Sequence, residues 1–313
     1  MKITVLGCGS WGLTIAWLLS KKYQDITVWG LEEFIQPMQQ NKSLTFPIKL
    51  DIPETIDLSF NLQESVRDAQ YILIVVPSDA VRIVSKQLKE VLNNPHAIIV
   101  NLAKGFELNT LYRMSEVLQQ ELPNNNISTL SGPTLAMEIL ENKPTAAVVA
   151  SENIEIAKEI QEDLSVNDLF RLYSNNDIIG VELGGSLKNV IAIASGFTHA
   201  LKLGDNAIAA MMTRGMAENV RLSVAMGAHP STLYGLSGIG DLIATCSSPT
   251  SRNYKVGYGL GSGKKLDDIL NSLGAVAEGV KTAVAVCDLA KKYNVEMPIS
   301  QAVKLLLEGK DSP

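Results

Sequence analysis

The stretch Gly7-Cys8-Gly9-Ser10-Trp11-Gly12 constrains the fold of this chain more than any other feature. It follows the apolar run from Ile3 to Leu6, which is typical of a buried strand, and it opens a segment with helical spacing. In such a G-x-G-x-x-G turn the first glycine permits a tight bend, the second lets phosphates approach the backbone, and the third lets helix and strand pack closely. The motif predicts a βα unit that binds a dinucleotide, with a tight turn that binds nothing as the alternative.

The order of elements along the chain favours two domains. Short apolar runs, each expected to be a strand, alternate with helical patterns at 10–22, 79–92, 110–121 and 153–162, which is typical of a parallel sheet covered on both faces. The expected strands are Ile3 to Leu6, Ile26 to Trp29, Tyr71 to Val76, Ala97 to Asn101, Ile127 to Leu130 and Ala146 to Ala150. Beyond the polar break at 174–177 almost every segment has helical spacing. We therefore predict an α/β dinucleotide-binding domain over 1–176 and an all-helical domain over 177–313.

Composition narrows the function classes. The chain has 313 residues, 46% of them hydrophobic, and a net charge of −6, so it can bury a large core but carries no basic field for nucleic acid or an anionic membrane. No leader segment and no apolar run of about 20 residues is evident, which favours a protein outside the membrane. Three scattered cysteines and three histidines predict reduced thiols in a cytoplasmic protein and no metal site.

Polar residues end several of the predicted strands, where open α/β sheets bind their ligands. Val76-Pro77-Ser78 follows one strand, and Ser131-Gly132-Pro133-Thr134 ends another, with Pro133 suited to the first position of a helix. Asn101 to Gly105 places a cation, Lys104, at a third strand end. Lys104 is a candidate for stabilising negative charge on a substrate, and a solvated loop lysine is the alternative.

The segment GVELGGSLKNVIAIASG places a second lysine on a helix face of small residues. Gly184, Gly185, Lys188, Ala192 and Ser195 recur at helical spacing, so that a backbone or a ligand can come close to Lys188. A lysine in such a place can be desolvated and titrate usefully, whereas a helix-packing seam with a lysine reaching to solvent is the alternative.

The late segment GLSGIGDLIATCSSPTSRN predicts an anion-binding site. A G-x-G-D turn presents Asp241, and Thr245 lies one helical turn later. Ser251 can cap the next helix, which puts Arg252 and Asn253 in a first turn whose N–H groups and dipole favour an anion. The planar guanidinium of Arg252 suits a phosphate, with a solvated surface arginine as the alternative.

Together these motifs resemble the bacterial-type NAD(P)-dependent glycerol-3-phosphate dehydrogenases. The resemblance runs nearly from end to end through six motifs in order: GCGSWG, NLAKGFE, LSGPTLAMEI, ELGGSLKNVIAIASG, GLSGIGDLIATCSSPTSRNYKVG and AEGVKTA. It implies a Rossmann domain joined to a helical domain of the 6-phosphogluconate-dehydrogenase type, with the active site in the cleft between them. The implied reaction is the reversible reduction of dihydroxyacetone phosphate to sn-glycerol 3-phosphate for glycerophospholipid synthesis.

The resemblance also implies a role for each matching residue. Lys188 would be the general acid and base, Lys104 would polarise the reacting oxygen, and Asp241 would complete the catalytic group. The implied substrate-binding residues are Lys104, Gly132, Thr134, Lys188, Asp241, Thr245, Ser251, Arg252 and Asn253. The implied cofactor-binding residues are Gly7, Gly9, Ser10, Trp11, Gly12, Glu32, Lys104, Ala136, Arg252, Val276 and Glu278.

Reduction of a ketone by hydride develops negative charge on oxygen, which needs a positive donor and a proton source. Two lysines can supply both, provided that burial and the charge of Lys104 lower the pKa of Lys188 toward neutrality. Glu32 lies 20 residues beyond Gly12, where a carboxylate can accept hydrogen bonds from the adenosine ribose. Because Leu31-Glu32-Glu33 carries two carboxylates, where family members commonly have Arg or His, we expect NAD to be preferred over NADP, or both to be used.

Two rival functions remain at the level of sequence. A 2-hydroxyacid or ketopantoate-type reductase would share the dinucleotide domain and a helix lysine, but would not need the Ser251-Arg252-Asn253 cluster. A non-catalytic NAD-sensing regulator would not need both Lys104 and Lys188. The resemblance makes a homodimer the expected assembly, although no segment identifies the interface.

Overall fold

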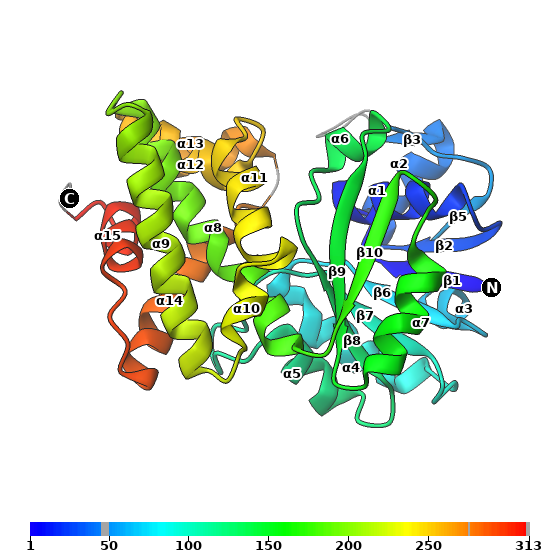
Figure 1. Cartoon of the computed structure of the whole chain (residues 1–313). Helices are drawn as coiled ribbons and strands as arrows, with labels where there is room; N and C mark the ends of the chain where they lie inside the picture. The colour runs from blue at the N-terminus through cyan, green and yellow to red at the C-terminus, as the bar shows by residue number, and fades with distance from the viewer. Residues whose placement is uncertain (45–49, 275, 311–313) are drawn as a thin grey trace. The chain divides into compact units, whose positions relative to one another are not determined.

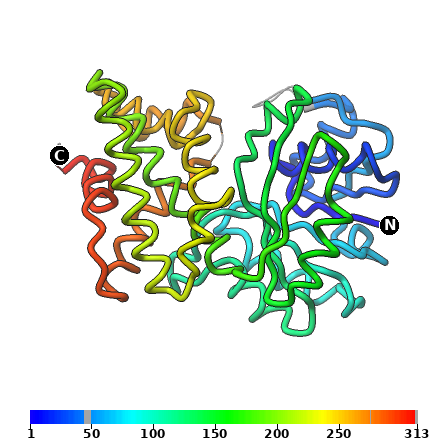
Figure 2. The backbone as a smooth tube through the Cα atoms, viewed as in Figure 1, coloured from blue at the N-terminus to red at the C-terminus, as the bar shows by residue number. Residues whose placement is uncertain are grey.

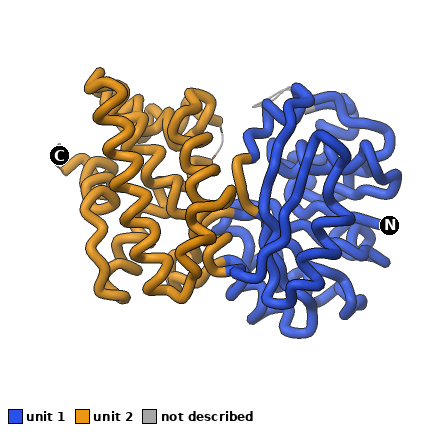
Figure 3. The backbone as a smooth tube through the Cα atoms, in the orientation of Figure 1, with its two compact units in different colours: residues 1–103, 114–130, 134–178 blue, residues 104–113, 131–133, 179–313 orange. Residues whose placement is uncertain are grey.

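The computed structural model describes residues 1–44, 50–274 and 276–310, and the chain folds into two compact units (Figures 1 and 3). The first unit comprises residues 1–103, 114–130 and 134–178, and the second comprises residues 104–113, 131–133 and 179–313. Two short segments, 104–113 and 131–133, which the sequence alone places in the first domain, thus belong to the second unit. Figure 2 follows the chain through both units.

The first unit is built on an eight-stranded sheet in the order β10-β9-β8-β7-β6-β1-β2-β5. Its strands are β1 (Lys2–Leu6), β2 (Asp25–Trp29), β5 (Ile56–Ser59), β6 (Tyr71–Ile74), β7 (Ile98–Asn101), β8 (Ile127–Ser131), β9 (Thr145–Ser151) and β10 (Phe170–Asn175). β1 pairs in parallel with β2 on one side and with β6 on the other, so the strand order reverses at β1 and β6. An open parallel sheet binds its ligand at such a switch point.

The six strands predicted from sequence are all present, and their residues are buried on both faces of the sheet. The helices of this unit are α1 (Ser10–Ser20), α2 (Glu32–Asn41), α3 (Leu62–Val66), α4 (Val81–Val91), α5 (Met114–Glu121), α6 (Ala136–Leu140) and α7 (Ile154–Leu164), with a 3₁₀ turn, η1 (Ser78–Ala80). A separate antiparallel pair is formed by β3 (Ser43–Leu44) and β4 (Leu50–Asp51). α1 packs on α6, and α4 packs on both α3 and α5.

Two sequence predictions at helix starts are wrong. The helix expected over 110–121 begins only at Met114, because Leu111 has a left-handed φ of +62° and Phe106 bridges Arg113 in a hairpin. Pro133 is not the first residue of a helix: α6 begins at Ala136, since Gly132 has a φ of +150° and Leu135 is still extended.

Helices make up most of the described part of the second unit, as the sequence predicts. They are α8 (Ile178–Ala200), α9 (Asp205–Ala225), α10 (Pro230–Leu233), α11 (Asp241–Ser247), α12 (Arg252–Gly261), α13 (Leu266–Leu273), α14 (Glu278–Tyr293) and α15 (Pro298–Leu307), with a π-helical turn, η2 (Leu236–Gly240). α8 supplies much of this unit's apolar core. Among the described residues, α8 alone has the length and hydropathy of a membrane span, but 89% of its apolar window is buried inside the protein, as in a core helix.

Candidate functional site

The glycine turn after β1 has the geometry that a dinucleotide needs. Gly7 has a φ of +127°, and a Cβ on Gly12 would lie 1.8 Å from the carbonyl oxygen of Gly7, so neither position tolerates a side chain. Gly9 is different, because nothing lies within 4 Å of the place where its Cβ would stand. It is also the N-cap of α1 and has no side chain to cap the first N–H groups. The turn therefore leaves open space beside a helix N-terminus, which fits a pyrophosphate.

Other predicted cofactor residues of the first unit lie on neighbouring elements. Ser10 and Trp11 open α1, and Ala136 opens α6. Glu32 opens α2 directly after β2 and accepts a hydrogen bond of 2.6 Å from Gln36. Leu31, Glu32, Glu33 and Gln36 line a shallow surface pocket. This acidic pocket lies on the turn after β2, where the sequence analysis predicts that the adenosine ribose binds.

In the second unit, α8 presents Lys188 on the predicted face of small residues. A Cβ on Gly184 would lie 2.5 Å from the carbonyl oxygen of Ser237, and one on Gly185 would lie 2.2 Å from the hydroxyl of Ser131. The two glycines therefore let η2 and the end of β8 approach the helix. This close packing buries Lys188, which is 7% exposed.

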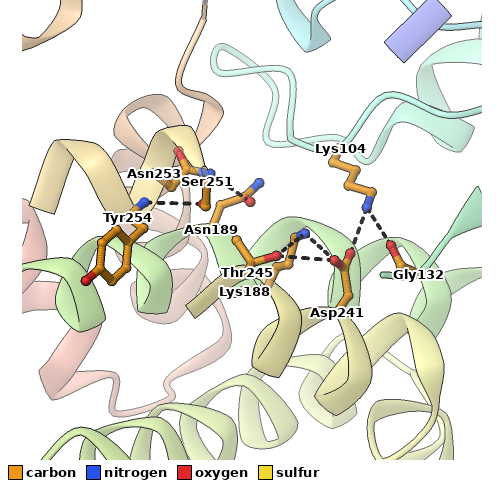
Figure 4. Close-up of polar contacts among 9 residues, drawn as sticks. All are labelled: Lys104, Gly132, Lys188, Asn189, Asp241, Thr245, Ser251, Asn253 and Tyr254. Carbon is orange, nitrogen blue, oxygen red and sulfur yellow. Dashed lines mark hydrogen bonds and ion pairs between the residues drawn. The ribbon is translucent and has the colours of Figure 1, made fainter. Parts of the chain in front are cut away.

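Two lysines converge on one carboxylate (Figure 4). Asp241, the first residue of α11, is 1% exposed and pairs with the ammonium of Lys188 through Oδ1. Its Oδ2 pairs with Lys104 Nζ at 2.7 Å, and Lys104 also donates to the carbonyl oxygen of Gly132 at 3.1 Å. Thr245, one turn along α11, accepts from Lys188 Nζ at 2.7 Å. Residues separated by up to 137 positions in sequence are thus brought into one cluster.

The electrostatics of this cluster suit proton transfer. Burial lowers the pKa of Lys188 to about 8; the charge of Asp241 acts against this shift and the charge of Lys104 adds to it. Burial also raises the pKa of the neighbouring Cys246 thiol to about 12, which keeps that sulfur protonated. A lysine whose pKa lies near 8 exists as both ammonium and neutral amine near neutral pH, so it can give a proton in one direction of the reaction and take one in the other.

The start of α12 follows the predicted capping arrangement. Ser251 is the N-cap, and its hydroxyl accepts from the backbone N–H of Tyr254 at 3.3 Å. Arg252, in the first turn, is exposed. The amide of Asn253 faces the protein: it donates to Asn189 on α8 at 2.9 Å and accepts from the backbone N–H of Gly279 on α14 at 2.9 Å. The side chain of Asn253 therefore ties three helices together, while its backbone lies in the first turn of α12.

The remaining predicted residues lie near chain turns. Thr134 lies in the short connection between β8 and α6. Val276 is 40% exposed just before α14, and Glu278 is the first residue of that helix.

Two buried asparagines lie outside the set of predicted site residues. Asn101, at the end of β7, is fully buried; its Oδ1 accepts from the N–H of Ala103 and its Nδ2 donates to the carbonyl of Ala103, both at 3.0 Å. A polar residue ending a buried strand is the signal that could have identified it. Asn189, next to Lys188, is 5% exposed, and its partner Asn253 is 64 positions away, so no local pattern indicates the pair.

Comparisons with known proteins find the same family of relatives over nearly the whole length of the chain. Residues 2–157 match the family model for the N-terminus of NAD-dependent glycerol-3-phosphate dehydrogenase, and residues 177–313 match the model for its C-terminus. A glycerol-3-phosphate dehydrogenase (NAD(P)+) from Thermoanaerobacter sp. strain X514 is 45% identical, with 99% of this chain and 94% of the relative covered. One from Listeria monocytogenes serotype 4b is 41% identical over 99% and 93%.

Solved structures agree as well. The glycerol-3-phosphate dehydrogenase of Coxiella burnetii superposes with a TM-score of 0.93 at 37% identity, covering 98% of this chain and 94% of the other. A ketopantoate reductase from Ralstonia eutropha, with a TM-score of 0.62 and 12% identity, shares the fold alone. This chain belongs to the NAD-dependent glycerol-3-phosphate dehydrogenase family.

Proposed function

We propose that the protein catalyses the reversible, NAD(P)-dependent reduction of dihydroxyacetone phosphate to sn-glycerol 3-phosphate. The observation that carries this proposal is the buried Lys188, which forms an ion pair with the same carboxylate, Asp241, as Lys104 does. Lys188 lies on α8, and the neighbouring Asn189 on the same helix is hydrogen-bonded to Asn253 at the start of α12. An acid-base group and a phosphate-suited helix start therefore belong to one packed set of helices. The names of the relatives described above support the same reaction.

In this proposal each residue of the lysine cluster has a distinct task. The bound nicotinamide supplies or accepts the hydride. Lys188 donates its proton to the C2 oxygen during reduction and takes it back during oxidation. Lys104 holds positive charge against that oxygen as negative charge develops there. Asp241 and Thr245 orient the Lys188 ammonium, because both are hydrogen-bonded to it.

The other proposed residues bind the substrate or the cofactor. Ser251, Arg252 and Asn253 hold the phosphate at the start of α12, where Arg252 contributes a permanent charge. Gly132 and Thr134 line the same substrate. Gly7, Gly9, Ser10, Trp11 and Gly12 hold the pyrophosphate, and Ala136, Val276 and Glu278 complete the cofactor site with Lys104 and Arg252. Residues 1–176 are the proposed dinucleotide domain and residues 177–313 the proposed substrate domain.

Glu32 and Glu33 favour NAD over NADP in this proposal. Two carboxylates on the turn after β2 would repel a 2′-phosphate, whereas Glu32 can accept hydrogen bonds from ribose hydroxyls. A role in glycerophospholipid synthesis, a cytoplasmic location and a homodimeric assembly are further parts of the proposal, and they rest on the family resemblance and the cysteine pattern.

A spectrophotometric assay tests the function directly. We expect NADH absorbance to fall when dihydroxyacetone phosphate is added and to remain constant with pyruvate or ketopantoate, which lack the phosphate. The same assay with NADPH should give a lower kcat/KM than with NADH. Turnover of ketopantoate but not of dihydroxyacetone phosphate would overturn the proposed reaction, and a strong preference for NADPH would overturn the inference from Glu32.

A further inference from the structure

The segment 104–113 is anchored to the second unit at both of its ends. The residues on either side, Ala103 and Met114, belong to the first unit, whereas 104–113 belongs to the second. Its first residue, Lys104, pairs with Asp241, and its last residue, Arg113, pairs with Glu182. Ion pairs therefore hold both points at which the chain enters and leaves the second unit.

The segment is a closed hairpin rather than a loose loop. Phe106 bridges Arg113, and the N–H of Glu107 donates to the carbonyl of Tyr112 at 3.0 Å. The N–H of Leu111 donates back to the carbonyl of Glu107 at 2.7 Å, in a turn where Leu111 is left-handed. Phe106 is 3% exposed and packs in the apolar core of the second unit. A hairpin closed in this way transmits the position of one end to the other.

The second anchor is well buried. Arg113 Nη1 lies 2.8 Å from Glu182 Oε2, and the two side chains are 12% and 5% exposed. Glu182 lies on α8 six residues before Lys188, which corresponds to about 9 Å along the helix axis. A largely desolvated arginine–carboxylate pair fixes geometry more strictly than an exposed pair does. Arg113 is therefore fastened to the helix that carries Lys188.

We propose that the ion pair between Arg113 and Glu182 positions Lys104, by holding the hairpin 104–113 on α8 so that the Lys104 ammonium stays against Asp241. This inference rests on the proposed function, because it assigns the pair a role in the same reaction. Arg113 and Glu182 are positioning residues, since they act through Lys104.

Displacement of Lys104 would have a kinetic consequence that a loss of folding stability alone would not have. Lys188 is faced by Asp241 and Cys246 on α11 and by Lys104 on the hairpin. The charge of Lys104 lowers the pKa of Lys188, so movement of Lys104 away from the cluster raises that pKa. Lys188 must be neutral to accept a proton during oxidation of glycerol 3-phosphate. Because a higher pKa keeps Lys188 protonated to higher pH, the acidic limb of the pH profile for oxidation moves to higher pH.

The test uses the full chain with the double variant Arg113→Met/Glu182→Leu. This change removes the directional pair without altering net charge, and apolar replacement of a buried pair commonly preserves stability. We expect kcat for dihydroxyacetone phosphate to fall about tenfold. The midpoint of the acidic limb for glycerol 3-phosphate oxidation should rise by about half a unit to one unit.

Glu182→Asp is the second variant, for use if the double variant does not fold. It keeps both charges and shortens one side chain by a methylene, and it should shift the same limb in the same direction. Glu218→Gln is the matched control. The buried Glu218 carboxylate caps α15 through the N–H groups of Ile299 and Ser300 in the same unit, so its loss should lower the melting temperature and leave the pH limb in place.

Folded variants of the pair with unaltered kcat and an unaltered limb would overturn the positioning role. Failure of the proposed function is distinguishable, because the unaltered protein would then not oxidise NADH with dihydroxyacetone phosphate at all.

Discussion

At the scale of single residues, the charge balance around Asp241 determines what Lys188 can do. A buried ammonium without a partner would lose its proton, and one with an unshared carboxylate would keep it well above neutral pH. Asp241 divides its two oxygens between Lys188 and Lys104, so Lys188 receives only part of its stabilisation. A pKa of about 8 follows from this compromise with burial.

Replacing Asp241 by Asn tests that balance. The neutral amide removes the charge that raises the pKa of Lys188, so the acidic limb for glycerol 3-phosphate oxidation should move below the position near pH 8 that is expected for the unaltered protein. Reduction at pH 7 should slow roughly a hundredfold, because Lys188 is then less protonated and less well oriented. Asp241→Glu, which keeps the carboxylate, should retain the limb near pH 8 even if its rate falls. A limb that stays in place in Asp241→Asn would refute the role assigned to this carboxylate.

At the scale of elements, reciprocal glycines hold α8 against α12. A Cβ on Gly257 of α12 would lie 1.8 Å from the carbonyl oxygen of Ile193, and a Cβ on Gly196 of α8 would lie 2.0 Å from that of Tyr254. Each helix therefore packs on the backbone of the other. This contact keeps the Ser251 cap and the Asn189 bridge in place relative to Lys188.

Gly257→Ala should accordingly destabilise the second unit. The added methyl group meets backbone atoms that cannot rotate away, and the free energy of unfolding should fall by about 3 kcal/mol. Thermal unfolding monitored by fluorescence measures the effect. Gly240→Ala is the control, because Gly240 is already helical and its nearest neighbour would lie 3.6 Å from the new Cβ. Equal melting temperatures for the two variants would contradict the close-packing interpretation.

The elements that the sequence did not predict have physical reasons for their weak signals. β5 and β10 form the two edges of the sheet, so polar residues face solvent and no continuous apolar run appears. In β10, buried Phe170 and Leu172 alternate with exposed Arg171 and Tyr173. α2 contains an internal proline, Pro37, which disfavours a helix on propensity alone. The central strands and long helices were predictable because both their faces are apolar or their spacing is regular.

At the scale of the whole molecule, the residues proposed to bind substrate and cofactor are divided between the two units. The glycine turn and the acidic pocket belong to the first unit, and the lysine cluster and the capped α12 belong to the second. Motif order was enough to nominate Lys104, Lys188 and Asp241 from sequence. The pairing of Asn189 with Asn253 and of Arg113 with Glu182 was not predictable, because each joins segments more than 60 positions apart with no shared period.

This division predicts that a change at the start of α12 alters substrate affinity more than cofactor affinity, even at Arg252, which also belongs to the proposed cofactor site. Arg252→Ala should raise KM for dihydroxyacetone phosphate about 10- to 100-fold, because a charged hydrogen bond to phosphate is lost, and should change KM for NADH far less. Lys255→Ala is the matched control, since it removes an exposed cation from the same helix one turn later and should alter neither constant. Equal increases in both KM values for Arg252→Ala would contradict the proposal that the main contact of this arginine is with the substrate phosphate.

The pH dependence of kcat/KM in both directions, with Lys188→Ala as reference, tests the central claim most directly. Because Lys188 must be neutral to accept a proton, oxidation of glycerol 3-phosphate should rise through a pKa of about 8. Reduction of dihydroxyacetone phosphate should fall through the same value, since Lys188 must then be protonated. Lys188→Ala should lose most of its turnover and show neither limb. Near wild-type turnover in Lys188→Ala, or limbs that persist without the lysine, would contradict the account.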